Sequence, residues 1–208
     1  MLNWGLVPLN KVVRGLVLAV LLVSTSVLGG CIGEKDIDIT ALNVEIEPAD
    51  VLYNQALANL KSGKFSEASQ KFNAIDKQHP YSEFARKSMV LNSFANYRMG
   101  RYSDSINTAR RYISLYPNSE DTAYAYYLVG LSYYKQIPQV TRDQKTARSA
   151  IAAFQEILQR YPDSEYVTDS EIKIRFARDQ LAGQEMQIGR YYQERKEYAA
   201  ALNRFRGV

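Results

Sequence analysis

The sequence is poor in the residues that build catalytic, metal and disulfide sites. It contains one cysteine, Cys31, which has no second thiol to pair with, and one histidine, His79, which stands before Pro80 at a predicted helix end. A histidine-based metal cluster or catalytic triad is therefore excluded. No glycine-rich phosphate loop is present. The formal net charge is only +4, with basic and acidic residues interspersed, which gives no argument for nucleic acid. We expect a binding protein, with no enzyme activity, no metal and no cofactor.

The first 30 residues predict the signal peptide of a bacterial lipoprotein. Lys11 and Arg14 lead into an apolar stretch, 15–28, that is shorter than the roughly 20 residues needed to span a bilayer. The run Leu28–Gly30 stands directly before Cys31 and resembles the lipobox, in which the cysteine becomes the lipid-carrying first residue. We expect covalent lipid on Cys31. The alternative is a small buried hydrophobic residue or a stray thiol.

The stretch after the cysteine predicts a tether. Residues 31–48 show no helical periodicity and alternate small, acidic and apolar types, which is typical of an extended linker. The residue after Cys31 is Ile32, not the aspartate that retains lipoproteins at the inner membrane of enterobacteria. We therefore expect lipid anchoring to the outer membrane, on its periplasmic face.

The rest of the chain is built from internal repeats. A glycine, an aromatic, a small residue and a proline recur at an offset of 37 positions: Gly63/Gly100, Phe65/Tyr102, Ala68/Ser105 and Pro80/Pro117. A third copy carries eight extra residues within 136–145, and a partial copy follows it: Gly130, Ala150, Phe154 and Pro162, then Gly189, Ala201 and Phe205. The pattern resembles the tetratricopeptide repeat. It predicts an all-α superhelical solenoid of antiparallel helix pairs over 49–208, with about four to five repeats, the last truncated; we expect the natural chain to continue.

Several repeated positions have a clear physical role. Gly63 and Gly100 are expected to end the first helix of their repeats in the left-handed conformation. Small residues such as Gly130 and Gly189 allow the two helices of one repeat to approach closely. Serines two residues after each repeat proline are expected to cap the next helix: Ser82, Ser119 and Ser164. Near the end of the chain we expect separate helices over 165–181 and 184–195.

The first helices of the repeats are expected to line a concave groove. Its aromatic faces and basic neighbours suit an extended apolar peptide that bears a carboxylate. The candidate groove residues are Tyr53, Lys61, Phe94, Tyr97, Arg98, Tyr124 and Tyr127. The alternative for each aromatic is a place in the core between repeats, which is the commoner fate of an aromatic stripe at helical spacing.

Signal, tether and repeats together resemble one family, the BamD/ComL-type lipoproteins of the outer-membrane β-barrel assembly machinery. The segments that carry the resemblance are 65–68, 160–166 and, most specifically, 185–192. The resemblance implies a non-enzymatic subunit that docks to the periplasmic domains of a BamA-type barrel insertase and to accessory Bam lipoproteins. It also implies that the N-terminal repeats receive unfolded barrel proteins. The C-terminal repeats would bind the insertase, with these candidates: Arg190, Tyr192, Arg195 and Arg204.

Two other functions remain open from the sequence. One is a different periplasmic repeat lipoprotein, a pilotin or a scaffold for cell-wall complexes. The other is a lipoprotein enzyme with a helical solenoid that acts on murein. Co-purification with a barrel insertase would support the assembly subunit, and co-purification with secretin or peptidoglycan enzymes would support the other repeat lipoprotein. Turnover of murein by the mature chain would support the enzyme.

Overall fold

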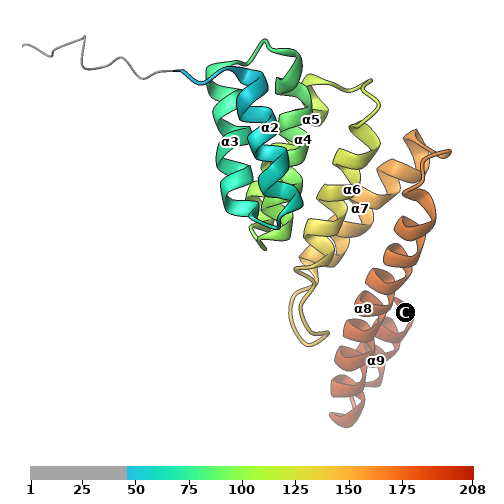
Figure 1. Cartoon of the computed structure of the whole chain (residues 1–208). Helices are drawn as coiled ribbons and strands as arrows, with labels where there is room; N and C mark the ends of the chain where they lie inside the picture. The colour runs from blue at the N-terminus through green and yellow to red at the C-terminus, as the bar shows by residue number, and fades with distance from the viewer. Residues whose placement is uncertain (1–45) are drawn as a thin grey trace, which may run out of the picture. The chain divides into compact units, whose positions relative to one another are not determined.

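The computed structural model describes residues 46–208. The predicted signal peptide, the predicted lipidation site Cys31 and most of the predicted tether lie outside these residues. The described part consists of helices and connecting turns, without strands (Figure 1). No helix in it is long and apolar enough to cross a membrane. The helices are α2 (Ala49–Lys61), α3 (Phe65–Gln78), α4 (Glu83–Arg98), α5 (Tyr102–Leu115), α6 (Thr122–Tyr134), α7 (Lys145–Arg160), α8 (Val167–Glu194) and α9 (Tyr198–Phe205).

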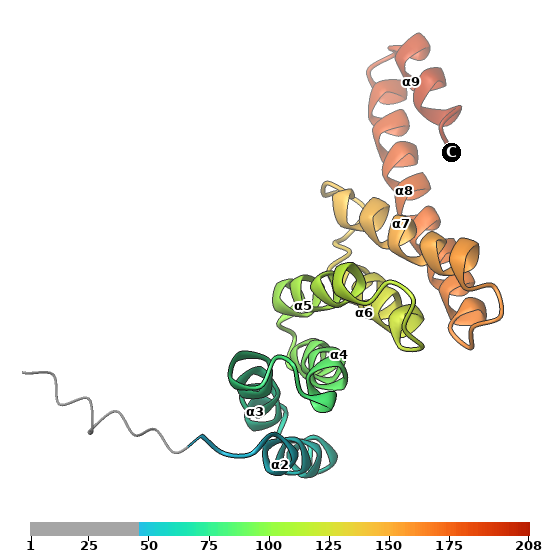
Figure 2. The same cartoon turned by 90° about the horizontal axis from the view of Figure 1, so that it is seen from above.

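The helices form a curved stack of antiparallel pairs, which confirms the predicted all-α solenoid. Each helix packs against the next one along the chain, and α2, α4, α6 and α8 also contact one another in sequence. The helices α3, α5 and α7 make no such contacts with one another. Figure 2 shows α3 and α5 on one side of the stack and α4 and α6 on the other. Because the even-numbered helices lie closer together, they form the inner side of the curve.

Two glycines end helices as predicted. Gly63 and Gly100 have φ of 76° and 75°, and the amide that follows each donates back into the helix, Lys64 to the Asn59 carbonyl at 2.9 Å and Arg101 to the Asn96 carbonyl at 2.9 Å. A side chain at either glycine would meet open space, so the backbone angle alone selects glycine.

Two of the three serines predicted to cap helices do not occupy an N-cap position, and the third occupies it without a capping hydrogen bond. Ser82 occupies the N-cap position of α4, without a side-chain hydrogen bond to the helix. After Pro117 the chain makes a further turn, so α6 begins at Thr122 and Ser119 instead accepts a hydrogen bond from the hydroxyl of Tyr112 at 2.7 Å. The α8 helix likewise begins after Ser164 has formed a turn. The helix start depends on this turn, which the sequence motif does not reveal.

Glycine also lets helices touch inside one repeat. A Cβ at Gly130 of α6 would lie 2.4 Å from the ring of Phe154 on α7, so only a hydrogen fits there. The same contact recurs between Gly189 of α8 and Phe205 of α9, at 2.3 Å. The small residues of the repeat pattern therefore set how closely paired helices approach.

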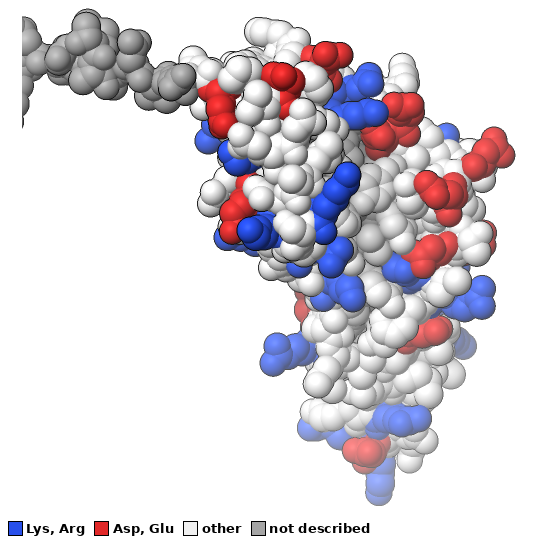
Figure 3. All heavy atoms as spheres, viewed as in Figure 1, with Lys and Arg blue, Asp and Glu red and all other residues white. Residues whose placement is uncertain are grey.

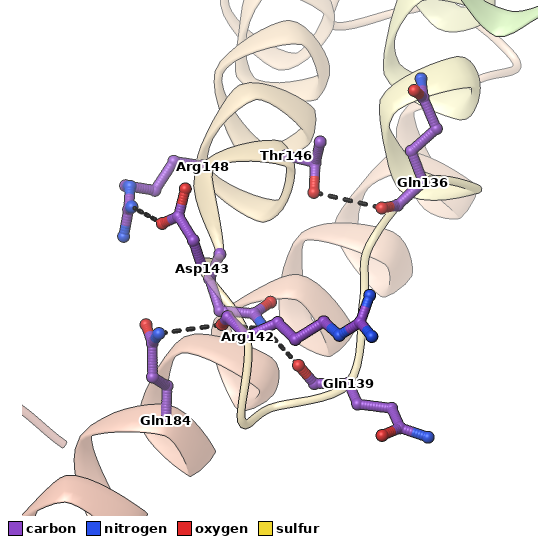
Figure 4. Close-up of polar contacts among 8 residues, drawn as sticks. Gln136, Gln139, Arg142, Asp143, Thr146, Arg148 and Gln184 are labelled. Atoms are coloured by element: carbon purple, nitrogen blue, oxygen red, sulfur yellow. Dashed lines mark hydrogen bonds and ion pairs between the residues drawn. The ribbon is translucent and has the colours of Figure 1, made fainter.

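The expected break between helices 165–181 and 184–195 is wrong, because α8 runs unbroken for 28 residues. Glycine at position 183 weakens a helix by about 1 kcal/mol relative to alanine but does not end it. At this point the inserted turn of the third repeat packs on the helix. The Gln184 side chain donates to the Arg142 carbonyl at 2.9 Å (Figure 4). Val140 lies 3.1 Å from where a Cβ of Gly183 would be.

The inserted turn is held in shape by its own hydrogen bonds. The fully buried side chain of Gln144 donates to the carbonyls of Gln139 and Arg142, at 2.9 and 3.1 Å. Arg148 pairs with Asp143 at 3.0 Å (Figure 4). The first half of α8 packs on α6 and α7, and its second half packs on α9 and this turn. The eight extra residues thus support the long helix beyond the third repeat.

Candidate peptide-binding groove

The predicted groove residues lie on the inner helices of the curve. Tyr53 and Lys61 are on α2, Phe94, Tyr97 and Arg98 on α4, and Tyr124 and Tyr127 on α6. All five aromatics are half-buried, and Lys61 and Arg98 are exposed. Figure 3 shows acidic and basic side chains interspersed over the surface. A row of basic side chains runs along the right-hand edge of the N-terminal helices. The aromatics are therefore neither sealed into the core nor freely exposed.

Tyr53 fills the space between the first two repeats. Its ring lies 5.1 Å from that of Phe84 on α4 and 6.1 Å from that of Phe72 on α3. Burial, with a smaller contribution from Asp121, raises the pKa of its hydroxyl above the ordinary value. Tyr127 has the equivalent role two repeats later, since its ring stacks on Tyr166 at 4.8 Å.

One part of the candidate groove is an aromatic pair covered by a cation. The rings of Phe65 and Phe94 meet edge to face at 6.4 Å. The Arg98 guanidinium lies 4.5 Å from the centre of the Phe65 ring and 5.6 Å from that of Phe94. Among the described residues Arg98 forms no ion pair, so the edge of its guanidinium remains able to bind a carboxylate.

Further along the groove, α6 and α8 share a cluster of tyrosines. Tyr124 and Tyr127 both contact Tyr166, at ring distances of 5.4 and 4.8 Å. Burial raises the pKa of all three hydroxyls, that of Tyr166 to about 12. Tyr97 contacts Tyr102 at 6.0 Å, and its pKa is also raised, mainly by burial. These tyrosines therefore stay neutral and act as hydrogen-bonding aromatic surfaces.

A carboxylate anchors this cluster. Asp169 accepts a hydrogen bond from the Tyr127 hydroxyl and two from the Lys173 ammonium, at 2.6 and 2.5 Å. Partial burial acts to raise the pKa of Asp169, but the hydrogen bonds from Lys173 and Tyr127 outweigh burial, and the pKa lies below its ordinary value. Because Lys173 is paired with Asp169, the predicted groove cations that form no ion pair among the described residues are Arg98 and Lys61, and Arg98 is the one that lies on aromatic rings.

The aromatic and basic surface of the inner helices continues onto α8, which the sequence did not reveal. Phe176 is 44% exposed and its ring lies 5.3 Å from that of Tyr134, while Lys173 lies 5.6 Å from the same ring. One signal for these contacts was present in the chain. An aromatic stands four positions after the repeat proline at both Phe84 and Tyr166, and each contacts a tyrosine of the preceding inner helix.

The predicted partner-binding residues gather on the last two helices. Arg190 is exposed on α8, and Arg195 holds the hydroxyl of exposed Tyr191 at 2.9 Å. Arg204 of α9 pairs with Glu185 at 3.2 Å. Tyr192 is half-buried and lies between two hollows of about 370 Å³ each, one beside Val140 and Tyr191 and the other beside Glu185 and Arg204.

No group of acidic, histidine or cysteine residues within 46–208 can hold a metal ion.

The chain is similar to known proteins over nearly all of the described region. A family described as YfiO, outer membrane lipoprotein, matches residues 46–208. A Caulobacter vibrioides protein named outer membrane protein assembly factor BamD is 40% identical over 92% of this chain, which spans 62% of that protein's length. A protein of the same name from Rickettsia prowazekii is 36% identical over 92% of this chain and 74% of its own length. The chain therefore belongs to the YfiO family of outer membrane lipoproteins, together with its relatives named BamD.

Proposed function

We propose that this chain is a non-enzymatic lipoprotein subunit of the outer-membrane β-barrel assembly complex. It docks to a BamA-type insertase and to accessory lipoproteins through its C-terminal helices, and it receives unfolded barrel proteins in its groove. The observation that carries the proposal is the family match over 46–208, joined to the name outer membrane protein assembly factor that the relatives bear.

The chemistry of the groove supports binding of a chain end. An unfolded barrel protein that ends in an aromatic residue presents a ring and a carboxylate together. Phe65 and Phe94 offer ring edges and faces for the aromatic, and Arg98, stacked on both, offers a fork of donors for the carboxylate. Because Arg98 is already held on the two rings, less side-chain entropy is lost when a ligand binds.

The C-terminal surface supports docking of a folded partner. Arg190 and Tyr191 are exposed, and Arg204 is tied only to Glu185 at the surface. An exposed ion pair of this kind contributes about 0–1 kcal/mol, so a partner carboxylate can replace it at small cost. The hollows on both sides of Tyr192 give that partner's side chains a place to enter.

Covalent lipid on Cys31 completes the proposal by holding the protein at the outer membrane. A Cys31→Ser variant is expected to appear in the soluble periplasmic fraction, whereas the unchanged chain stays with outer membranes after cell fractionation. Retention of the variant in the membrane would contradict lipid anchoring through this residue, although attachment through partner proteins must first be removed by a high-salt wash.

The groove is tested by site-specific photo-crosslinking in cells. A photoreactive phenylalanine analogue replaces Phe94 or Phe176, both of which lie on the inner helices, and Gln70, exposed on the outer helix α3, serves as the control. Barrel proteins should be captured from the two groove positions and not from Gln70. The capture should fall when Arg98→Glu is added, because the carboxylate then meets a like charge.

Three outcomes would overturn the proposal or one part of it. Capture of only lipid or murein from the groove positions removes the substrate-binding role. Purification of the intact chain with secretin or peptidoglycan enzymes instead of an insertase assigns it to another periplasmic complex. An Arg204→Glu variant that retains the insertase at full yield would remove the docking role of the C-terminal end, while leaving the groove untouched.

A further inference from the structure

The outer side of the solenoid carries two hollows that occupy equivalent places in successive repeats. The helices α3, α5 and α7 do not contact one another, and the two hollows lie in the furrows between them, with α4 or α6 as the floor. The first hollow, over α4, has a volume of about 170 Å³, and the second, over α6, has about 320 Å³. We refer to them as the first and second outer notch.

All seven residues that line the first notch have repeat equivalents in the second. On the first two helices of each notch the offset is 37 positions, and on the third it is 45, because of the inserted turn. The equivalent pairs are Asn73/Arg110, Asp76/Ile113, Met89/Tyr126, Asn92/Val129, Asn107/Ala152, Thr108/Ala153 and Arg111/Glu156. The two notches therefore share one backbone framework and differ in side chains.

The first notch is closed by polar contacts. Arg111 of α5 reaches across to Asp76 of α3 with two hydrogen bonds, at 2.5 and 3.1 Å. On the floor, Asn92 accepts from the Ser69 hydroxyl at 2.7 Å. These groups satisfy one another, so nothing in the first notch requires a partner.

The second notch has lost these contacts. Ile113, Val129, Ala152 and Ala153 replace four polar residues, and they line the notch beside the polar or charged residues Arg110, Ser149, Glu156 and Arg160. Glu156 stands where Arg111 would bridge the furrow, and it pairs instead with Arg160 on its own helix at 2.5 Å. The guanidinium of Arg110 lies 5.7 Å from the ring of Tyr133 and meets no carboxylate among the described residues.

We propose that the second outer notch binds an apolar side chain from an acidic amphipathic segment of another protein. The lining removes apolar surface of the ligand from water, and Arg110 supplies a charge for a carboxylate beside it. A volume of about 320 Å³ is at the small end for ligand pockets and suits one or two side chains. A long acyl chain would need a deeper channel. This surface lies on the helices opposite the groove, so it goes beyond the proposed function.

The test compares two synthetic amphipathic helical peptides that share one leucine stripe, one with glutamates and one with lysines on its polar face. Binding to the full chain in detergent micelles is followed by NMR of alanine methyl groups, which include Ala152 and Ala153. The acidic peptide should shift these signals and bind about tenfold more tightly than the basic one. In a separate experiment, binding of the chain to anionic phosphatidylglycerol vesicles tests whether the surface binds lipid instead of a peptide.

Matched variants separate the two notches. Ala152→Trp fills the second notch and should weaken binding of the acidic peptide by about tenfold or more, while Asn107→Trp, at the equivalent exposed position of the first notch, should not. Arg110→Glu should reverse the preference between the peptides, and Asn73→Glu should leave it unchanged. Circular dichroism checks that each variant is folded.

Each contrary result overturns the proposal. If the acidic and the basic peptide bind with equal affinity, Arg110 does not select an acidic partner. If Ala152→Trp and Asn107→Trp weaken binding of the acidic peptide equally, the second outer notch is not the binding site. Arg110-dependent binding of vesicles without binding of the acidic peptide assigns the surface to lipid. Since none of these positions is in the groove or at the C-terminal surface, failure here leaves the proposed function intact.

Discussion

The Gly130–Phe154 and Gly189–Phe205 contacts have the same local geometry in different surroundings. In each, a ring covers a glycine so closely that a Cβ would lie within 2.4 Å of it. Phe154 is fully buried among α6, α7 and α8, and its neighbours include Ile157 and Ile174. Phe205 is half-buried, and α9 packs against α8 alone among the described helices. The comparison teaches that the repeat motif determines which residues touch, while the residues packed around the contact determine how much it stabilises the fold.

The largest expected difference follows from truncating the two rings. Phe154→Ala should lower the free energy of unfolding by about 3–5 kcal/mol, because a fully enclosed ring leaves a cavity. Phe205→Ala should lower it by about 1–2 kcal/mol, because water already reaches part of that ring. Urea unfolding followed by circular dichroism measures both. Equal losses would mean that the surroundings of the two contacts do not matter.

Adding one methyl group to each glycine sharpens the comparison. At Gly130 the new Cβ meets a ring that is enclosed on all sides, so Gly130→Ala should cost about 1–3 kcal/mol. At Gly189 the Phe205 ring can swing toward solvent, and the gain in helix propensity, about 1 kcal/mol, offsets the clash. We expect Gly189→Ala to be nearly neutral in the same urea experiment. A large loss at Gly189 would show that α9 is held as firmly as α7.

The sequence predicted those features that depend on local spacing. Residues that recur at an offset of 37 positions predicted the glycine turns, the small residue that contacts Phe154 and the solenoid itself. They did so because the paired helices of each repeat pack in the same way. The continuity of α8 did not follow, since it depends on an inserted turn about 40 residues away that packs at Gly183. The Asp169 cluster was missed for a similar reason, because its partner Tyr127 comes from a different repeat.

A further set of equivalent positions lies in the three turns that stand before the second helix of a repeat. Lys196 adopts φ of 62°, and the amides of Lys196 and Glu197 make the same turn hydrogen bonds as those at Gly63 and Gly100. A non-glycine residue pays about 1 kcal/mol or more for this conformation. Because the Lys196 side chain is exposed, Lys196→Gly should stabilise the protein by about 1 kcal/mol, measured by urea unfolding.

The control for this prediction is the reverse change at a turn that already has glycine. Gly63→Ala should destabilise by about 1 kcal/mol, although a Cβ there meets open space. If both variants lower stability, the side chain of Lys196 makes a contribution larger than the backbone strain, and the equivalence of the three turns breaks down.

The smallest effect concerns Asp169 of α8, which accepts a hydrogen bond from Tyr127 of the inner helix α6. The pKa of Asp169 lies below its ordinary value in the folded protein. Its stabilising contribution is therefore complete above the unfolded pKa of about 3.9 and is lost as the pH falls through the lower folded pKa. Because the Asp169 side chain is 43% exposed, solvent screening limits this contribution to about 1 kcal/mol or less.

Asp169→Asn removes the charge and hence this part of the pH dependence. The free energy of unfolding is measured with urea between pH 5 and pH 3, a range of about one unit on either side of the ordinary carboxyl pKa of about 3.9. Over this range the unchanged chain should lose slightly more of its free energy of unfolding than the variant does. Parallel pH curves for the unchanged chain and Asp169→Asn would show that the tyrosine contacts alone hold α8 against α6.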